Sequence, residues 1–165
     1  MILELIYPRH PDYKICLDIY KEAFSKKERV SRWVFFFLMM RNKGEFYAIK
    51  SNLNSPVIGM TFICPTDKLT FIFYLAIAKA YQNQGYGHQV LDEIKKKYTN
   101  TIFLNAHKLE SEIDQRRLDF YHDNSFINNE ELMDKNDEYI PLSYPDKLKK
   151  DELTSFYKKL KSIKK

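Results

Sequence analysis

Two of the four glycines in this chain, Gly85 and Gly87, lie between an apolar run at residues 71–77 and a helical pattern that begins near Gly87. A strand-to-helix turn with two glycines exposes several consecutive backbone N–H groups at the start of a helix. These unpaired donors and the helix dipole both favour negative charge, so such a turn is suited to holding an anion. The chemistry predicted for these residues is the binding of a phosphate-bearing ligand.

The residues around the two glycines do not match the common nucleotide-binding loops. A P-loop needs Lys and then Ser or Thr after its last glycine, and here His88 follows Gly87. A dinucleotide fingerprint needs a third glycine at position 90, which is Val90 in this chain, and an acidic residue about 20 positions later. The phosphate ligand is therefore not predicted to be held in either of these nucleotide folds.

Cysteine and histidine residues give no metal or redox pattern. Cys16 and Cys64 have no metal or redox spacing, and two cysteines do not make a disulfide framework. Both are predicted to be reduced and buried thiols. His88, His107 and His122 lack the spacing of metal ligands, so we expect no metal centre.

The glycine turn is predicted to lie within one mixed domain. Apolar periodicity predicts, in order, a strand at 2–7, helices at 12–24 and 32–42, strands at 45–50, 56–64 and 69–77, a helix from about 87, a strand at 102–104, a helix at 112–124 and a hairpin at 125–143. The three central strands indicate an antiparallel meander, and the strand, helix and strand that follow predict a right-handed crossover with a parallel pair. The predicted fold class is α+β.

The predicted helix at 32–42, with Ser31 as its N-cap, is unusual because residues 33–40 are apolar on every side. A helix of this kind is either buried or lines an apolar cleft or a partner surface. The sequence leaves both possibilities open.

Charge and composition favour a globular, intracellular protein. Residues 145–165 carry eight lysines and three acids, whereas residues 1–144 carry 19 basic and 19 acidic residues. The C-terminal segment is predicted to be an amphipathic helix with a lysine-rich outer face that extends a domain at 1–144, and the balanced remainder argues against a nucleic-acid partner. No apolar run reaches the ~18 residues of a membrane span, and no signal peptide is evident, so we expect a cytoplasmic protein without a membrane partner.

Residues 75–87, with the sequence LAIAKAYQNQGYG, closely resemble the acetyl-CoA-binding motif of the GNAT superfamily of N-acetyltransferases. Residues 118–126, with the sequence LDFYHDNSF, resemble the second motif of the same family. The resemblance covers about residues 1–143. It implies a mixed, mostly antiparallel central sheet flanked by helices, with a parallel strand pair splayed at the CoA site, and acetyl-CoA as co-substrate.

The resemblance also implies roles for individual residues. Tyr121 matches the tyrosine that protonates the departing CoA thiolate after an amine attacks the thioester carbonyl. Backbone groups of the strand would pair with the pantetheine arm, and the loop and first helical turn would hold the CoA pyrophosphate. The cofactor-binding residues implied in this way are Leu75, Ala76, Ile77, Gln82, Asn83, Gln84, Gly85, Tyr86, Gly87 and His88.

This chain departs from the family pattern at several positions. Gln82 replaces the commoner arginine, which leaves a neutral donor, so the anion would be held mainly by backbone N–H groups. Asp114 replaces an asparagine that often contacts CoA, and Asn105 is a substitute candidate for that contact. No acidic residue lies at 71–77, where some members place a base, and Glu28 or Glu45 could serve instead.

Two functions from different classes follow from this resemblance. The first is an N-acetyltransferase that acts on a primary amine of a small molecule or a peptide, with loop 25–30 and the aromatic helix shaping the acceptor site. The second is a catalytically silent acyl-CoA-binding or interaction module with the same fold. A homodimer mediated by the C-terminal helix is compatible with either function.

Overall fold

The computed structural model describes residues 1–108, 111–133 and 137–161. The strands form one sheet in the order β1-β2-β3-β4-β5-β7-β6. Their bounds are β1 Ile2–Leu5, β2 Glu45–Lys50, β3 Gly59–Pro65, β4 Leu69–Ile77, β5 Thr101–His107, β6 Ile127–Asn128 and β7 Tyr139–Tyr144. The helices are α1 Tyr13–Ala23, α2 Arg32–Met40, α3 Tyr86–Lys97, α4 Glu112–Asp123 and α5 Lys150–Lys161, with 3-10 turns at Lys79–Tyr81 and Glu130–Leu132.

The sheet is mostly antiparallel, as predicted. β1 pairs with β2, β2 with β3, β5 with β7 and β6 with β7, all antiparallel. β4 and β5 pair in parallel, with Leu69 opposite Thr101 and Phe71 opposite Phe103. The predicted α+β class is confirmed, with a mostly antiparallel mixed sheet and a parallel pair whose strands come before and after the glycine turn in sequence. The predicted strand at 56–64 begins only at Gly59 and runs to Pro65.

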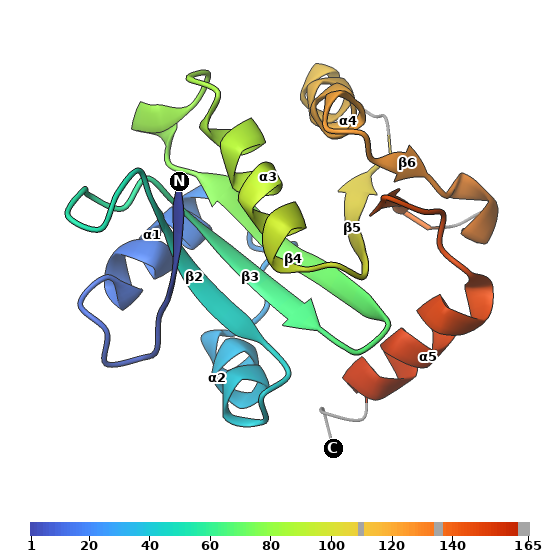
Figure 1. The fold of residues 1–165 in the computed structure, drawn as a ribbon, viewed down its shortest axis with the longest axis horizontal. Coiled ribbons are helices and arrows are strands. Elements are labelled where there is room, and N and C mark those ends of the chain that lie inside the picture. Colours follow the sequence, from blue (N-terminus) through green and yellow to red (C-terminus); the bar gives the residue numbers. More distant parts are fainter. Residues whose placement is uncertain (109–110, 134–136, 162–165) are drawn as a thin grey trace. The chain divides into compact units, whose positions relative to one another are not determined.

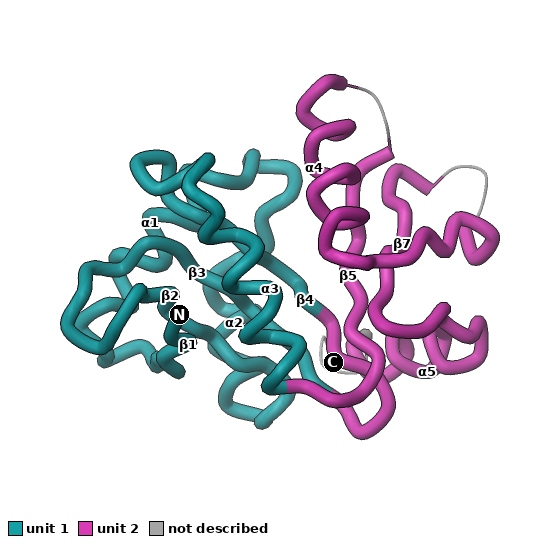
Figure 2. The backbone as a smooth tube through the Cα atoms, turned by 45° about the horizontal axis from the view of Figure 1, so that its top comes forward, with its two compact units in different colours: residues 1–65, 72–97 teal, residues 66–71, 98–165 magenta. Residues whose placement is uncertain are grey.

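The backbone groups into two compact units (Figure 2). Unit 1 contains residues 1–65 and 72–97, and unit 2 contains residues 66–71 and 98–165. The first residues of β4, Leu69–Phe71, therefore belong to unit 2, and the strand continues in unit 1 from Ile72. The C-terminal helix α5 belongs to unit 2.

One face of the unit 1 strands is covered by α1 and α2 through an aromatic core. Phe35 of α2 stacks on Phe62 of β3 with ring centroids 4.4 Å apart, and it also meets Phe46 of β2 at 5.6 Å. Tyr20 of α1 lies edge-on to Tyr74 of β4 at 4.8 Å. Because aromatic rings bury a large apolar area, this cluster fixes both helices against the strands.

The opposite face of the unit 1 strands is covered by α3, which crosses in front of them in Figure 1. Tyr47 points away from its neighbour Phe46 because successive strand side chains alternate between faces. Lys97 of α3 lies over the Tyr47 ring at 5.4 Å. Val90, Leu91 and Ile94 of the same helix are fully buried. The helix that follows the glycine turn is thereby anchored along its apolar side.

Unit 2 has a core of its own, to which the C-terminal helix contributes. Phe156 of α5 packs edge-on against Phe103 of β5 at 5.0 Å and Phe71 of β4 at 5.6 Å. Leu153 is also buried, whereas Lys158 and Lys159 are exposed. Within the segment 145–165 that was predicted to be an amphipathic helix, α5 covers Lys150–Lys161, and residues 162–165 lie outside the described residues.

Helix α2 is neither fully buried nor fully exposed. Its predicted N-cap is confirmed, since the Ser31 side chain accepts the backbone N–H of Trp33 at 3.4 Å. One face is buried and consists of Phe35, Leu38 and Met39. The other face exposes 57% of Trp33, 52% of Phe37 and 67% of Met40. Among the described helices, none is long and apolar enough to cross a membrane.

Candidate functional site

The glycine turn connects the end of β4 to the start of α3 within unit 1. The chain leaves β4 at Ile77, where Ala78 N donates to Ile58 O at 2.9 Å. A single 3-10 turn follows, in which Tyr81 N donates to Ala78 O at 2.8 Å. Residues 82–85 then lead directly into the first turn of α3. The turn thus lies at the carboxyl end of the strand that pairs in parallel with β5.

Two residues of this turn have left-handed backbone conformations. Asn83 has φ +60° and Gly85 has φ +77°. Asparagine tolerates this region, whereas most side chains lose about 1–2 kcal/mol there. A Cβ added to Gly85 would meet no atom within 4 Å. Gly85 is therefore needed for its backbone conformation, and the space beside it is open to a ligand.

The first turn of α3 presents backbone donors beside that open space. The first helical hydrogen bond is donated by Gln89 N to Gly85 O at 3.4 Å. The N–H groups of Tyr86 and Gly87 come before it, where an α-helix offers no internal acceptor. With the helix dipole, these donors would favour an anion here, and the anion-binding site predicted from the sequence stays a prediction. His88 lies in the same turn and is exposed.

Two glutamine side chains close the loop onto its own backbone. Gln82 Nε2 donates to Ile77 O at 2.9 Å, and Gln84 Nε2 donates to Ala80 O at 3.0 Å. One N–H of the Gln82 amide is thus used to hold the loop against the end of β4, and its second N–H remains a donor. The expectation that backbone N–H groups would supply most of the attraction for an anion stays a prediction.

The strand residues Leu75, Ala76 and Ile77 lie next to β3 at an unusually close approach. A Cβ on Gly59 of β3 would lie 2.5 Å from the Ala76 carbonyl oxygen, closer than real Cβ contacts. The hydroxyl of the buried Thr61 donates to Tyr74 O at 2.9 Å. Glycine at position 59 therefore lets β3 and β4 approach each other just before the glycine turn.

The loop at 25–31 is tied to β4 by the hydroxyl of Tyr74. This hydroxyl donates to Glu28 O at 2.6 Å and accepts Val30 N at 3.2 Å. Tyr20 of α1 adds a third bond, from its hydroxyl to Val30 O at 3.1 Å. Burial raises the pKa of both tyrosines, so both keep their protons and remain donors. The sequence analysis missed this connection, because nothing in the local pattern links residues so far apart.

The two candidate bases are both engaged in hydrogen bonds. Glu28 Oε2 accepts the backbone N–H of Ser25 at 2.7 Å, so its carboxylate lies at the start of the 25–31 loop. Glu45 Oε2 accepts the Tyr47 hydroxyl at 2.5 Å within β2. Each carboxylate keeps a second oxygen that can act as an acceptor, so the prediction that Glu28 or Glu45 serves as the base stays a prediction.

In unit 2, Tyr121 lies in the last turn of α4. Its ring contacts Phe120 at 5.1 Å and Phe126 at 5.7 Å, and its carbonyl accepts Phe126 N at 3.0 Å. Burial raises the pKa of Tyr121 to about 12, partly opposed by the positive charge of Arg117. The phenol is therefore protonated throughout the physiological pH range.

The other two unit 2 positions singled out by the sequence also have clear local partners. Asn105 of β5 donates from Nδ2 to the Tyr157 hydroxyl of α5 at 2.9 Å. Asp114 lies in the first turn of α4, where its carboxylate accepts the Ser111 hydroxyl at 2.6 Å and its N–H donates to Ser111 Oγ at 3.2 Å. These reciprocal bonds cap the helix, which gives the acidic residue at 114 a structural reason.

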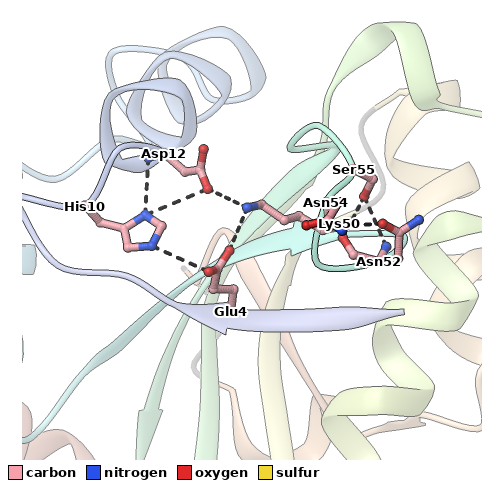
Figure 3. Close-up of polar contacts among 7 residues, drawn as sticks. All are labelled: Glu4, His10, Asp12, Lys50, Asn52, Asn54 and Ser55. Atoms are coloured by element: carbon pink, nitrogen blue, oxygen red, sulfur yellow. Dashed lines mark hydrogen bonds and ion pairs between the residues drawn. The ribbon is translucent and has the colours of Figure 1, made fainter.

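A polar cluster in unit 1, far along the chain from the glycine turn, also has the composition of a metal site (Figure 3). One ligand atom each of Glu4, His10 and Asp12 lies within 4.8 Å of the others. However, Lys50 Nζ lies 2.7 Å from Glu4 Oε2 and 2.6 Å from Asp12 Oδ2. The ammonium group already occupies the position between the carboxylates, so we interpret the cluster as an ion-pair network that joins β1, β2 and the start of α1.

Comparison with known proteins is consistent with this site. A model of the acetyltransferase (GNAT) family matches residues 13–126, which include both the glycine turn and Tyr121. No curated protein matches the chain significantly in sequence.

Several solved structures share the fold. A GNAT-family protein from Bacteroides thetaiotaomicron superposes with a TM-score of 0.84 at 18% identity, covering 99% of this chain and 97% of that one. A spermidine/spermine N-acetyltransferase from Vibrio cholerae gives a TM-score of 0.62 at 11% identity over 86% and 90% of the two chains. An aminoglycoside 6'-N-acetyltransferase complexed with coenzyme A gives 0.59 at 13% identity over 88% and 100%. At these identities the structural likeness shows the fold alone.

Proposed function

This chain belongs to the GNAT family of acetyltransferases, and we propose that it transfers an acetyl group from acetyl-CoA to a primary amine. The acceptor amine would belong to a small molecule or a peptide and would react directly in a ternary complex. The observation that carries the proposal is the turn at 82–88, where a left-handed Gly85 comes directly before the backbone N–H groups of Tyr86 and Gly87 at the start of α3. Acetyl-CoA supplies the acetyl group as a thioester and carries a pyrophosphate that such a turn can bind.

The residues of β4 and the residues of the turn would hold different parts of acetyl-CoA. Asn83, Gln84, Gly85, Tyr86, Gly87 and His88 would provide the pyrophosphate cradle, and Leu75, Ala76 and Ile77 the backbone that aligns the pantetheine arm. Gln82 would act indirectly, because its amide holds the loop to Ile77 O. The turn binds through neutral donors, so the helix dipole contributes much of the attraction for the anion.

Tyr121 would act as the hydrogen-bond donor to the sulfur that leaves as the amide forms. Its pKa of about 12 is well above the pKa of about 8.5 of an ordinary thiol. Complete proton transfer from the phenol to a thiolate is therefore unfavourable, whereas a hydrogen bond that strengthens as charge develops on sulfur is favourable. We thus assign Tyr121 to stabilising the developing thiolate rather than to delivering a free proton.

Several neighbours of this fold acetylate amines of small molecules, namely spermidine or spermine and aminoglycosides. Those names support a small-molecule amine as the acceptor here. The incoming amine must lose a proton, and we propose Glu28 as the group that accepts it, directly or through water. Asn105 could contact acetyl-CoA through its amide oxygen, because its Nδ2 is bonded to Tyr157.

Thermal melting with acetyl-CoA and a CoA-release assay over a panel of amines test this proposal. Millimolar acetyl-CoA should raise Tm, and at least one amine should give turnover.

Tyr121→Phe should lower kcat by about 100-fold, the order expected when one donor to a developing charge is removed, while the Kd for acetyl-CoA changes little. Gly85→Ala should give the opposite result, a weaker Kd for acetyl-CoA, because alanine is strained at φ +77°.

The controls separate the two candidate functions. A protein that binds acetyl-CoA but gives no turnover with any amine would be the silent acyl-CoA-binding module. Unchanged melting at millimolar acetyl-CoA would contradict both functions. Full activity in Tyr121→Phe would remove Tyr121 from the mechanism while leaving acetyl transfer intact.

A further inference from the structure

An exposed apolar ridge runs along the outer face of α2. Trp33, Phe37 and Met40 are spaced by four and three residues, so they project from one side of the helix. Their exposed fractions are 57%, 52% and 67%. The opposite side of the same helix is buried through Phe35, Leu38 and Met39. We call the three exposed residues the α2 ridge. They do not form part of the core of unit 1.

Cations surround the α2 ridge in sequence. Residues 25–44 contain six basic residues and one acid, for a net charge of +5, while the rest of residues 1–144 carries a net charge of −5. The basic residues are Lys26, Lys27, Arg29, Arg32, Arg41 and Lys43. The single acid, Glu28, accepts a backbone N–H through its carboxylate. Positive charge is therefore concentrated on the segment that also exposes the ridge.

One of these cations, Arg32, is in direct contact with the ridge at the start of the helix. The guanidinium of Arg32 lies over the Trp33 ring, 5.6 Å from its centroid. Lys26 and Lys27 are exposed in the preceding loop, and that loop is held in place by the Tyr74 hydroxyl. Arg32 and Trp33 thus lie side by side at the start of α2, and Lys26 and Lys27 are exposed in the anchored loop that comes directly before it.

The positive charge of this segment favours some binding partners over others. A second copy related by two-fold symmetry would bring the same basic segment against this one, and like charges across an interface oppose association. An anionic partner is favoured instead. Aromatic side chains projecting between basic residues are typical of helices that lie in the interface of an anionic bilayer, where Trp and Phe enter the headgroup boundary.

We propose that the α2 ridge, with Lys26, Lys27 and Arg32, docks the protein on an anionic membrane surface. The sequence prediction of no membrane partner rested on the lack of a spanning segment, and surface docking requires none. This proposal does not depend on acetyl transfer. It predicts reversible binding that combines shallow insertion of the ridge with attraction to acidic lipid headgroups.

Trp33 is the single tryptophan of the chain, so its emission reports directly on the ridge. The full-length protein is titrated with vesicles of phosphatidylcholine alone and of phosphatidylcholine mixed with phosphatidylglycerol. We expect a blue shift of the Trp33 emission and co-sedimentation with the mixed vesicles, both weakened by added salt. Neutral vesicles should give much weaker binding, because the cations find no acidic headgroups.

Matched variants separate the apolar and the charged contributions. Phe37→Gln should weaken partitioning to the mixed vesicles by about fivefold, because half of its ring is already exposed and available for insertion. Lys26→Gln combined with Lys27→Gln should weaken it by roughly 25-fold, about fivefold per cation. The controls are Leu53→Gln, an apolar residue outside the segment that is 68% exposed, and Lys14→Gln on α1. Neither control should change partitioning.

Three results would overturn the proposal. The first is no blue shift with mixed vesicles while the protein is folded by circular dichroism. The second is equal binding to neutral and anionic vesicles, or equal loss in the control variants. The third is a Trp33 blue shift that depends on protein concentration without lipid, because it would assign the ridge to a second copy of the chain.

Discussion

The close approach of β3 and β4 at Gly59 allows a quantitative test of the acyl-CoA site. In Gly59→Ala the new Cβ would lie 2.5 Å from the Ala76 carbonyl oxygen, whereas ordinary contacts begin at 3.4 Å. The two strands must therefore separate by about 0.9 Å at this point. Ile77 Cδ1 and Ile49 Cδ1, at 3.0 and 3.2 Å, limit movement in other directions.

This displacement should affect both stability and ligand binding. Overpacking of this kind destabilises a fold by about 1–3 kcal/mol. Ala76 lies in the strand segment that we propose aligns the pantetheine arm, and a misplacement of about 1 Å can lower catalysis by as much as 100-fold. We therefore expect a lower Tm together with a Kd for acetyl-CoA at least several-fold weaker, measured by calorimetry on the folded protein.

Gly44→Ala is the matched control for this test. Its added Cβ would lie 2.5 Å from Phe62 Cζ and 2.9 Å from Leu38 Cβ, so it is crowded to the same degree against core side chains rather than strand backbone. It should lower Tm similarly and leave the Kd for acetyl-CoA unchanged. If Gly59→Ala lost stability but bound acetyl-CoA as tightly as Gly44→Ala, the assigned role of residues 75–77 would be refuted.

Two further predictions concern buried groups of unit 1. Lys50→Met should lower the free energy of unfolding by about 2–3 kcal/mol, which is less than for a fully buried ion pair because Glu4 and Asp12 keep some solvent contact. Denaturant unfolding at neutral pH measures the change. A loss smaller than that of exposed surface ion pairs would contradict a stabilising role for the network around Lys50. The two carboxylates raise the pKa of Lys50, so the stabilisation is fully present at neutral pH and disappears only as pH rises through that raised pKa. Burial raises the pKa of Cys16 and Cys64 to about 12. At pH 8 only about one thiol in 10,000 is ionised, so iodoacetamide should label the folded protein negligibly and the unfolded protein fully; rapid labelling of both cysteines in the native state would show that one or both are accessible.

The sequence predicted those elements whose limits are marked by local signals. β2 and β4 have the predicted bounds, because polar turns and a change in periodicity define both ends. Ser31 was predicted as a cap from its side chain and its position before an apolar run, and it caps α2. The glycine turn was predicted as an anion site because two rare glycines before a helix have a local physical meaning.

Other features depend on contacts that no local pattern encodes. Residues 33–40 are apolar throughout, so periodicity could not show which face of α2 is exposed. The Tyr74 hydroxyl reaches Glu28 O across 46 residues of sequence, and only the folded chain brings them together. The amide of Gln82 donates to Ile77 O, and the sequence could show only that a donor exists at this position, not which acceptor it finds.

The glutamine amides that close the 82–84 segment have a consequence for the entropy of binding. A loop that ordered only around its ligand would lose about 1–2 kcal/mol of backbone conformational freedom per residue at that moment. Here Gln82 and Gln84 fix the loop to Ile77 O and Ala80 O while the chain folds. Part of the ordering is therefore in place before a ligand arrives, so the binding step loses less interaction energy to organising the loop.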